Sequence, residues 1–458
     1  MPTLKFEDTI AAVATPPGEG GIAVIRVSGP QSIAIISQVF RSSKKINLEK
    51  QPTHTLHHGC LVDETGKPVD EVLIHLFRAP HSYTGEEVIE ISCHGSMRLT
   101  RQILELLIHR GARHAEPGEF TKRAFLHGKI DLTQAEAVLD LIRARSDLSL
   151  ETAMRQLQGS LSSKIHQLKE SLMKIYAHLE AHLDFPDEHL ETFSSSEILG
   201  RMEKLEKEMS ALIASFRRGA ALREGILAVI VGRPNVGKSS LLNALLAKDR
   251  ALVSSLPGTT RDALEETLEI GGWAIRLVDT AGLAFDPKDP LDEMGIERTK
   301  RYLEEGDFFI FLMDSSSEWT PEDEAILSLL QGKKFLPVMN KVDLPQKLNP
   351  KLFQEEPCRI SCLAGDGIPH LEKRLEEKMN QMEIVQESLT LTRLRHKQAL
   401  EQALTSLKES KKTLQEQTSV EFVLEDLKAS LDALREFIGE IYSEDLLDVI
   451  FQEFCIGK

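Results

Sequence analysis

The most constraining feature of this chain is a phosphate-binding motif set between an apolar run and a helix-like run. Residues Gly232 to Ser239 read GRPNVGKS, directly after ILAVIV and directly before SLLNALL. Strand, glycine-rich loop and helix are the context in which consecutive backbone N–H groups and a helix N-terminus bind phosphate oxygens. We therefore expect a doubly wound parallel sheet, with Lys238 at the β- and γ-phosphates and the Ser239 hydroxyl on Mg²⁺.

Further short motifs follow in the order expected of a guanine-nucleotide site. DTAG ends an apolar strand, so Asp279 should hold Mg²⁺ through a water and the Gly282 amide should contact the γ-phosphate. PGTTRD lies between the two motifs, and its Thr260 is the candidate switch residue that completes the magnesium shell. In NKVD, the Asp343 carboxylate can accept both N1–H and the exocyclic amine of guanine, which adenine does not offer together.

The segment SCL after the last strand should contact the guanine oxygen through its backbone. The expected nucleotide contacts are Asn235, Val236, Gly237, Lys238, Ser239, Ser240, Ser254, Ser255, Leu256, Pro257, Gly258, Thr259, Thr260, Asp279, Thr280, Ala281, Gly282, Asn340, Lys341, Asp343, Ser361, Cys362 and Leu363.

Catalysis needs a group that these motifs do not supply. Leu283 stands where Ras-like enzymes carry a glutamine that positions water, and an apolar side chain cannot orient water. The catalytic group must then come from another side chain, a cation or a partner. The alternative is a GTP-binding switch with negligible turnover.

Three kinds of sequence pattern follow one another along the chain. From Thr9 to about Glu116, short β-branched runs alternate with glycine and proline around two helix-like segments, Ser32–Phe40 and Met97–His109, which predicts an α+β domain. Helical patterns follow and return near the C-terminus, on either side of an alternating strand–helix region. That order indicates an α/β module inserted into a helical domain.

Within the first helical region, apolar spacing predicts one long helix over Leu150–Leu183 and another over Ser195–Arg217. Thr133 followed by Glu136 is typical of a capping box. In the α/β region we expect strands at Ile226–Val231, Leu264–Ile270, Trp273–Val278, Phe308–Met313, Phe335–Met339 and Arg359–Ile360.

The net charge of −16 argues against nucleic-acid binding over the whole surface and does not exclude a local basic patch. The clusters around Arg223 and Arg393 are candidates for such a patch, or are ordinary charged helix faces. Five scattered cysteines indicate free thiols in a reducing compartment. No run of about 20 apolar residues is present, so we expect a cytoplasmic protein that does not span a membrane.

The chain resembles the MnmE (TrmE) family of tRNA modification GTPases along essentially its whole length. The resemblance rests on TPPGEGGIAVIRVSG, SYTGEEVIEISCHG, PGEFTKRAFLHGKIDLTQAEAV, LDFPDE, GRPNVGKSSLLNAL, PGTTRD, DTAGL, GIER, NKVD and the terminal FCIGK. It implies a folate-binding, dimerising α+β domain (1–118), an all-α helical domain in two parts (119–219 and 385–458) and an inserted P-loop GTPase domain (220–384).

The resemblance also implies a reaction. With the flavoprotein MnmG, in a heterotetramer-type complex, and a 5-formyl- or methylene-tetrahydrofolate donor, the family adds a carboxymethylaminomethyl-type group at C5 of tRNA uridine 34. The implied folate contacts are Arg26, Glu90, Lys129 and Lys458. The implied ligands of a catalytic potassium ion are Asn235, Ser254, Leu256 and Thr259, in a loop ordered when two GTPase domains pair.

One departure concerns the acid that positions the attacking water. The family places a Glu three residues before the glycine of GIER, where this chain has Asp292, with Glu293 beside it, so either residue is a candidate. Cys455, near the terminus, is open to a functional or an inert role. The competing function, a ribosome-assembly or RNA-binding switch GTPase, would need neither the N-terminal domain nor the FCIGK terminus.

Overall fold

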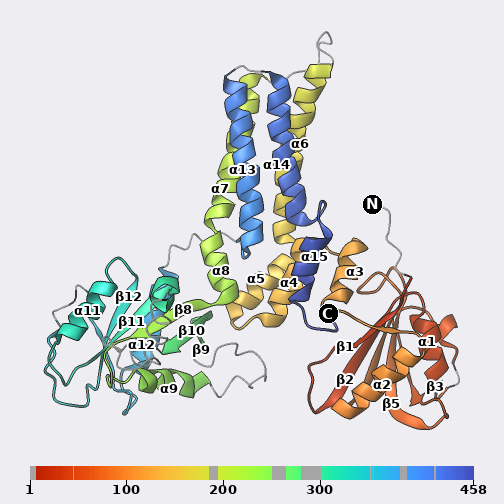
Figure 1. Ribbon diagram of the computed structural model, residues 1–458, viewed down its shortest axis with the longest axis horizontal. Helices are drawn as coiled ribbons and strands as arrows, with labels where there is room; N and C mark the ends of the chain where they lie inside the picture. Colours follow the sequence, from red (N-terminus) through yellow and green to blue (C-terminus); the bar gives the residue numbers. More distant parts are fainter. Residues whose placement is uncertain are drawn as a thin grey trace, which may run out of the picture. The chain divides into compact units, whose positions relative to one another are not determined.

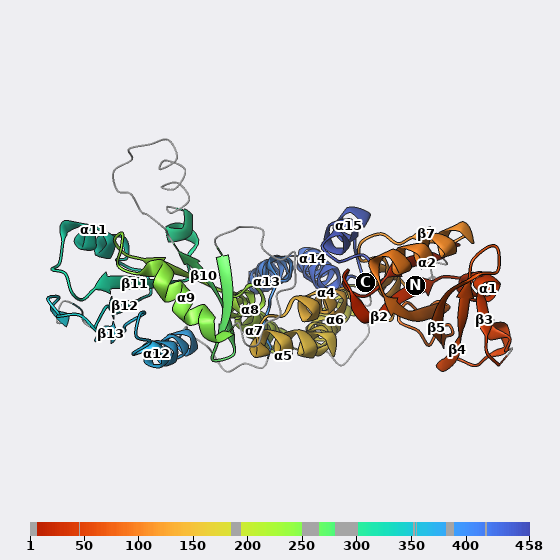
Figure 2. The same cartoon turned by 90° about the horizontal axis from the view of Figure 1, so that it is seen from below.

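The computed structural model describes residues 7–44, 46–184, 194–249, 265–279, 301–350, 353, 355–381, 389–416 and 419–458. The chain divides into two compact units. Unit 1 comprises Met1–Leu139, Gln156–Leu205 and Gln402–Lys458, and unit 2 comprises Asp140–Arg155 and Glu206–Glu401. Figures 1 and 2 show the elements of each unit from two directions.

Unit 1 begins with a sheet in the order β3-β4-β5-β6-β2-β1-β7, antiparallel except for the parallel β1–β7 pair. Its strands are β1 (Ile10–Val13), β2 (Gly20–Ser28), β3 (Phe40–Ser42), β4 (Thr55–Val62), β5 (Pro68–Phe77), β6 (Val88–Gly95) and β7 (Arg113–His114). Alternate apolar side chains of the strands face helices α1 (Ser32–Val39) and α2 (Met97–His109) in one core. The α+β prediction is confirmed, and α2 has the predicted bounds.

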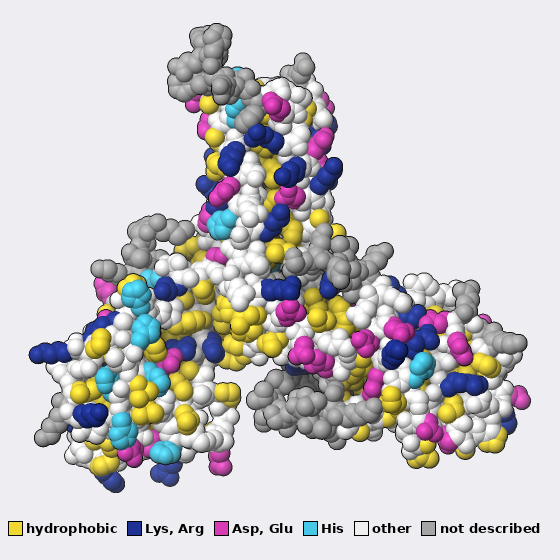
Figure 3. All heavy atoms as spheres, turned by 180° about the vertical axis from the view of Figure 1, so that it is seen from behind, with side chains coloured by type: hydrophobic (Ala, Val, Ile, Leu, Met, Phe, Trp, Pro, Cys, Tyr) yellow, Lys and Arg dark blue, Asp and Glu magenta, His cyan; other side chains and the backbone are white. Residues whose placement is uncertain are grey.

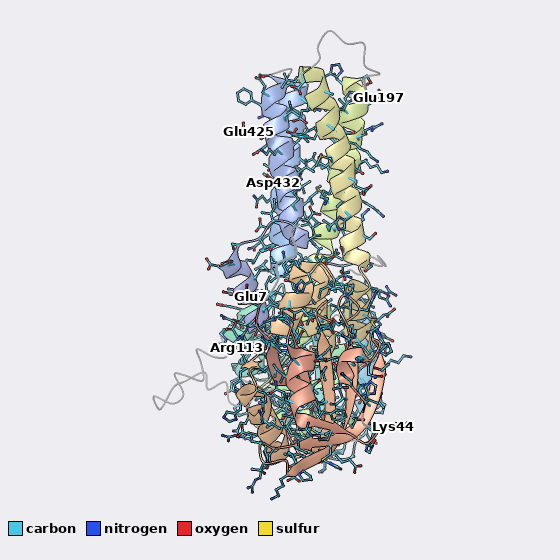
Figure 4. The ribbon with its side chains drawn as sticks, turned by 90° about the vertical axis from the view of Figure 1, so that its right-hand side faces the viewer. Glu7, Lys44, Arg113, Glu197, Glu425 and Asp432 are labelled. Atoms are coloured by element: carbon cyan, nitrogen blue, oxygen red, sulfur yellow. The ribbon has the colours of Figure 1, made fainter. Side chains whose placement is uncertain are left out.

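The rest of unit 1 is helical. Its elements are α3 (Glu119–Leu126), parts of α4 (Leu132–Arg143), α7 (Ser195–Ala214) and α13 (Leu394–Gln415), and α6 (Ser160–Asp184), α14 (Val420–Ile438) and α15 (Glu444–Gln452). Ser430 on α14 donates to the Ala403 carbonyl of α13, and Lys411 of α13 pairs with Glu203 of α7. Charged groups such as Glu197 and Glu425 lie on the outside of these helices (Figure 4).

Three local helix predictions were wrong in detail. The expected helix over Leu150–Leu183 is two helices, α5 (Asp147–Leu157) and α6, because Gly159 has a left-handed φ of 84° that interrupts the helix. The second helix ends at Ala214 and is followed by α8 (Phe216–Glu224).

The capping box of α4 is formed two residues earlier than predicted. The Gln134 N–H donates to Asp131 Oδ1 and the Asp131 N–H donates to Gln134 Oε1, both at 3.0 Å. Asp131 therefore replaces Thr133 as the capping residue, and Gln134 replaces Glu136.

Unit 2 holds a sheet in the order β13-β12-β11-β8-β10-β9, parallel except for the β9–β10 hairpin. Its strands are β8 (Ile226–Val231), β9 (Glu265–Ile270), β10 (Trp273–Asp279), β11 (Phe308–Asp314), β12 (Phe335–Asn340) and β13 (Cys358–Arg359), and helices α9 (Lys238–Asp249), α11 (Pro321–Leu329) and α12 (Ile368–Asn380) accompany it. The predicted strands are confirmed to within a residue where they are described. Apolar cores on both faces give the doubly wound arrangement.

In each of the two basic clusters one arginine, Arg223 or Arg393, points inward in unit 2. Both guanidinium groups pair with the carboxylate of Asp140, at 3.0 and 2.6 Å. These two arginines therefore connect helical segments and do not form an exposed basic patch. All five cysteines are free thiols, as predicted. Among the helices of the described ranges, none is long and apolar enough to cross a membrane.

Candidate functional site

The glycine-rich loop of unit 2 runs from the end of β8 to the start of α9. All of β8 is buried, because it lies between β10 and β11 and apolar side chains cover both faces. A Cβ on Gly232 would lie 2.3 Å from the Leu312 carbonyl oxygen. Gly237 has a φ of 103°, and its Cβ would lie 2.3 Å from Asn340 Nδ2. Both positions therefore require glycine, as the motif predicts.

Lys238 lies across this loop. Its side chain is buried, and the ammonium donates to the carbonyls of Gly232 and Arg233, each at 3.0 Å. Ser239 and Ser240, at the start of α9, are exposed. Asn235 has a φ of 64°, which is uncommon for a residue with a side chain and typical of functional turns. The loop thus presents a cation, hydroxyls and a helix N-terminus together.

Asn340 connects the loop to the segment after β13. It is buried, its Nδ2 donates to the Val236 carbonyl at 2.9 Å, and its Oδ1 accepts from the Cys362 N–H at 3.1 Å. Ser361 is buried and forms a turn, in which the Ala364 N–H donates to Ser361 Oγ at 3.1 Å. Three predicted segments that are far apart in sequence therefore meet at the carboxyl ends of β8, β12 and β13.

The other residues of these segments differ in exposure. Lys341 has a φ of 62°, and its ammonium donates to the Asn235 carbonyl at 2.9 Å and to Asp314 at 2.6 Å. Asp343 and Leu363 are exposed. Burial raises the pKa of the Cys362 thiol to about 11, so it is a neutral thiol at physiological pH. Sequence reasoning missed Asp314, although it ends an apolar strand as Asp279 does.

Several predicted residues lie outside the described ranges. Asp279 ends β10, paired in register with Ile230 of β8, but its side chain is not among those described. Outside the described residues lie Ser254, Ser255, Leu256, Pro257, Gly258, Thr259, Thr260, Thr280, Ala281, Gly282, Leu283, Asp292 and Glu293.

The predicted folate contacts lie in unit 1. Arg26 of β2 and Glu90 of β6 are partners in register, with Arg26 Nη2 and Glu90 Oε1 2.8 Å apart. The guanidinium lies 5.2 Å from the Tyr83 ring centroid and 5.5 Å from that of Phe120. Sequence reasoning missed these two aromatic residues, although both stand in motifs that carry the family resemblance. Their rings fix the orientation of the Arg26 charge.

The C-terminal residues pack against the same arginine. Arg26 Nη1 donates to the Gly457 carbonyl at 3.4 Å, and the Phe120 N–H donates to the Lys458 carbonyl at 3.2 Å. Burial and then the nearby Arg26 charge hold the pKa of Lys458 below its ordinary value. Lys129 donates to the Pro80 carbonyl at 2.9 Å, in the loop that also carries Tyr83. Cys455, by contrast, is exposed.

Comparison with known proteins gives matches along the whole chain. A family model described as the MnmE helical domain matches residues 132–455, and one described as the GTP-binding protein TrmE N-terminus matches residues 9–129. Relatives named tRNA modification GTPase MnmE are 45% identical in Natranaerobius thermophilus, 43% in Alkaliphilus metalliredigens and 44% in Carboxydothermus hydrogenoformans. Each of these alignments covers 99% of this chain and 100% of the relative.

Proposed function

Because this chain belongs to the MnmE family of tRNA modification GTPases, we propose that it hydrolyses GTP in the course of tRNA modification. The observation that carries the proposal is the meeting of the glycine-rich loop, Asn340 and the Cys362 segment at one edge of the unit 2 sheet. Phosphate and base contacts then lie on one surface, at the carboxyl ends of parallel strands, where open α/β sheets bind ligands.

The loop residues would hold the phosphates. The amides around Gly237 and the N-terminus of α9 bind phosphate oxygens, and the Lys238 ammonium exchanges its two carbonyl acceptors for phosphate oxygens. The exposed Ser239 hydroxyl suits a magnesium ion, with Thr260 and, through a water, Asp279 as further ligands. Magnesium supplies charge neutralisation at the β- and γ-phosphates. Asp343, exposed at the same edge, accepts two guanine N–H groups.

A potassium ion would supply the charge that an arginine finger supplies elsewhere. Its ligands would be Asn235, Ser254, Leu256 and Thr259. The left-handed backbone at Asn235 supports this assignment, because it sets an exposed amide side chain at the tip of the phosphate loop. Asp292 or Glu293 would orient the attacking water. Hydrolysis would then depend on the pairing of two GTPase domains.

Unit 1 would bind the one-carbon donor, a 5-formyl- or methylene-tetrahydrofolate. The Glu90 carboxylate, oriented by its pair with Arg26, suits the amino-pterin ring. Lys129 and Lys458 would complete the site. With MnmG, the chain would add a carboxymethylaminomethyl-type group at uridine 34 of tRNA.

A homodimer through the N-terminal domain would complete the functional unit. Hydrophobic and histidine side chains gather on this domain (Figure 3, left). On adjacent strands of its sheet, exposed His58 of β4 is paired with exposed Leu73 of β5, and exposed Leu56 lies two residues before His58. Apolar surface of this kind is typical of interfaces. The N-terminal domain also favours the tRNA modification role over a ribosome-assembly switch, which would not need it.

GTP hydrolysis by the purified protein in KCl and in NaCl, at equal ionic strength, tests the mechanism. The proposal predicts strong stimulation by potassium and loss of hydrolysis in the Lys238→Ala variant. Equal rates in both salts would remove the potassium site but leave GTP hydrolysis in place. Undiminished hydrolysis by Lys238→Ala would contradict the nucleotide site itself.

A further inference from the structure

Arg233, the second residue of the glycine-rich loop, is held by a buried carboxylate on a neighbouring helix. Its Nε donates to Asp323 Oδ1 at 2.8 Å, and its Nη2 donates to Ser317 Oγ at 2.8 Å. The exposed fraction of the side chain is 17% for Arg233 and 2% for Asp323. Such a pair is screened little by solvent, so breaking it leaves a charge unpaired in a poorly solvated place.

Asp323 is itself fixed by the start of α11. Thr320 is the N-cap of this helix, and Asp323 Oδ2 accepts hydrogen bonds from the Thr320 N–H at 3.1 Å and from its hydroxyl at 3.0 Å. Each carboxylate oxygen therefore has its own partner, one in the helix cap and one in the loop. The arginine is anchored to a rigid helix start.

The same segment also supports the loop at a second point. Asp314, at the end of β11, accepts from Lys341, which in turn donates to the Asn235 carbonyl. Asp314 also accepts from the Ser316 N–H at 2.9 Å and from its hydroxyl at 2.6 Å. Residues 314–323 thus hold the glycine-rich loop at residues 233 and 235. These two positions lie on either side of Pro234, before the amides that face phosphate in such motifs.

We propose that Asp323 is a positioning residue for nucleotide binding, which acts through Arg233 to keep the glycine-rich loop in its phosphate-binding conformation. The proposal rests on the proposed placement of the nucleotide at this loop. Preorganised amides bind without a further cost of ordering, so a loop released at Arg233 should bind phosphate more weakly. Asp323 touches neither the phosphates nor the attacking water, so its loss should change affinity far more than the rate at saturation.

The test compares Asp323→Asn with Glu355→Gln in the full-length protein, with a fluorescent GDP analogue as the probe. Asparagine retains the size and one acceptor for the helix cap but removes the charge opposite Arg233. Glu355 pairs with Arg374 and Lys378 in the same unit, outside the nucleotide site, so its variant controls for loss of an acid–base pair. We expect Asp323→Asn to raise the Kd for the analogue and the KM for GTP about tenfold or more, with kcat within twofold. Glu355→Gln should leave the Kd within twofold.

Two results would overturn the proposal. One is a Kd for Asp323→Asn within twofold of the wild type, and the other is an equal loss of affinity in Glu355→Gln. If Asp323→Asn does not fold, as judged by circular dichroism, Arg233→Gln removes the same pair from the loop side and should give the same tenfold loss. Lys238→Ala, measured in parallel, separates the two proposals, because retained nucleotide binding in that variant would contradict the placement of the nucleotide.

Discussion

Asn340 joins the glycine-rich loop, which we expect to bind phosphate, to the Cys362 segment, which we expect to contact the base. Its truncation should therefore weaken nucleotide binding. Truncation in Asn340→Ala removes the hydrogen bonds to the Val236 carbonyl and from the Cys362 N–H, and leaves both groups without that partner. A buried group left unsatisfied costs about 1–3 kcal/mol, so the two together should weaken nucleotide binding by about 2–6 kcal/mol. At about 1.4 kcal/mol per tenfold change, this is a rise in Kd of about 30-fold to about 20,000-fold.

Asn380→Ala is the matched control for this experiment. The Asn380 Oδ1 accepts from Trp273 Nε1 at 3.1 Å in the same unit, so the same substitution removes one side-chain hydrogen bond outside the site. Titration with a fluorescent GDP analogue should show weak binding for Asn340→Ala and wild-type binding for Asn380→Ala, with thermal melting reporting the stability of both. A Kd for Asn340→Ala within threefold of the wild type would refute the reasoning. So would an equal loss in the control.

Three further predictions follow from the same contacts. Gly237→Ala should abolish GTP binding, because the added Cβ would lie 2.3 Å from the amide nitrogen of Asn340. In the control variant Gly332→Ala, φ is also positive but nothing lies within 4 Å of the added Cβ, so the same titration should show wild-type affinity. Burial tends to raise the pKa of Glu119, but Arg113 and Arg123 outweigh burial and hold the pKa below its ordinary value of 4.5, so the protein should lose stability as pH falls below about 4.5. Thermal melting at pH 7 and pH 4 should show a smaller loss of stability in Glu119→Gln than in the wild type. An equal loss of stability in the variant would count against this prediction. Exposed Cys455 should react with iodoacetamide at pH 8 before Cys93, whose burial raises its pKa to about 11, and mass spectrometry showing the reverse order would contradict the burial assignment.

Local sequence patterns were sufficient to predict the strand, turn and helix that surround the nucleotide site. The run at Ile226–Val231 and its glycine-rich loop predicted the strand, the turn and the start of α9, because chain-local sterics and burial decide them. The break at Gly159 was missed, since a single glycine within an apolar helical pattern does not show whether its φ will be positive.

Contacts between distant segments could not be predicted from sequence patterns. The Arg233–Asp323 pair joins residues 90 positions apart, and the bridge between Pro117 and Ile456 joins residues 339 positions apart. The sequence does not show which aspartate an arginine pairs with, because many exposed ion pairs consist of the same two residue types and contribute little to stability. Tyr83 and Phe120 were missed for the same reason, as their role depends on the position of Arg26 between them.

The most direct test of the account is a reconstituted tRNA modification reaction followed by mass spectrometry of the nucleosides. The mixture contains a MnmG flavoprotein with NADH as its reductant, methylene-tetrahydrofolate as the one-carbon donor, glycine as the amine and unmodified tRNA. The account predicts that the C5-substituted uridine forms with the wild-type chain and GTP. It should not form when GTP is replaced by a non-hydrolysable analogue or when the chain carries Lys238→Ala. Full modification under either of these conditions would contradict the claim that GTP hydrolysis at the glycine-rich loop drives the reaction.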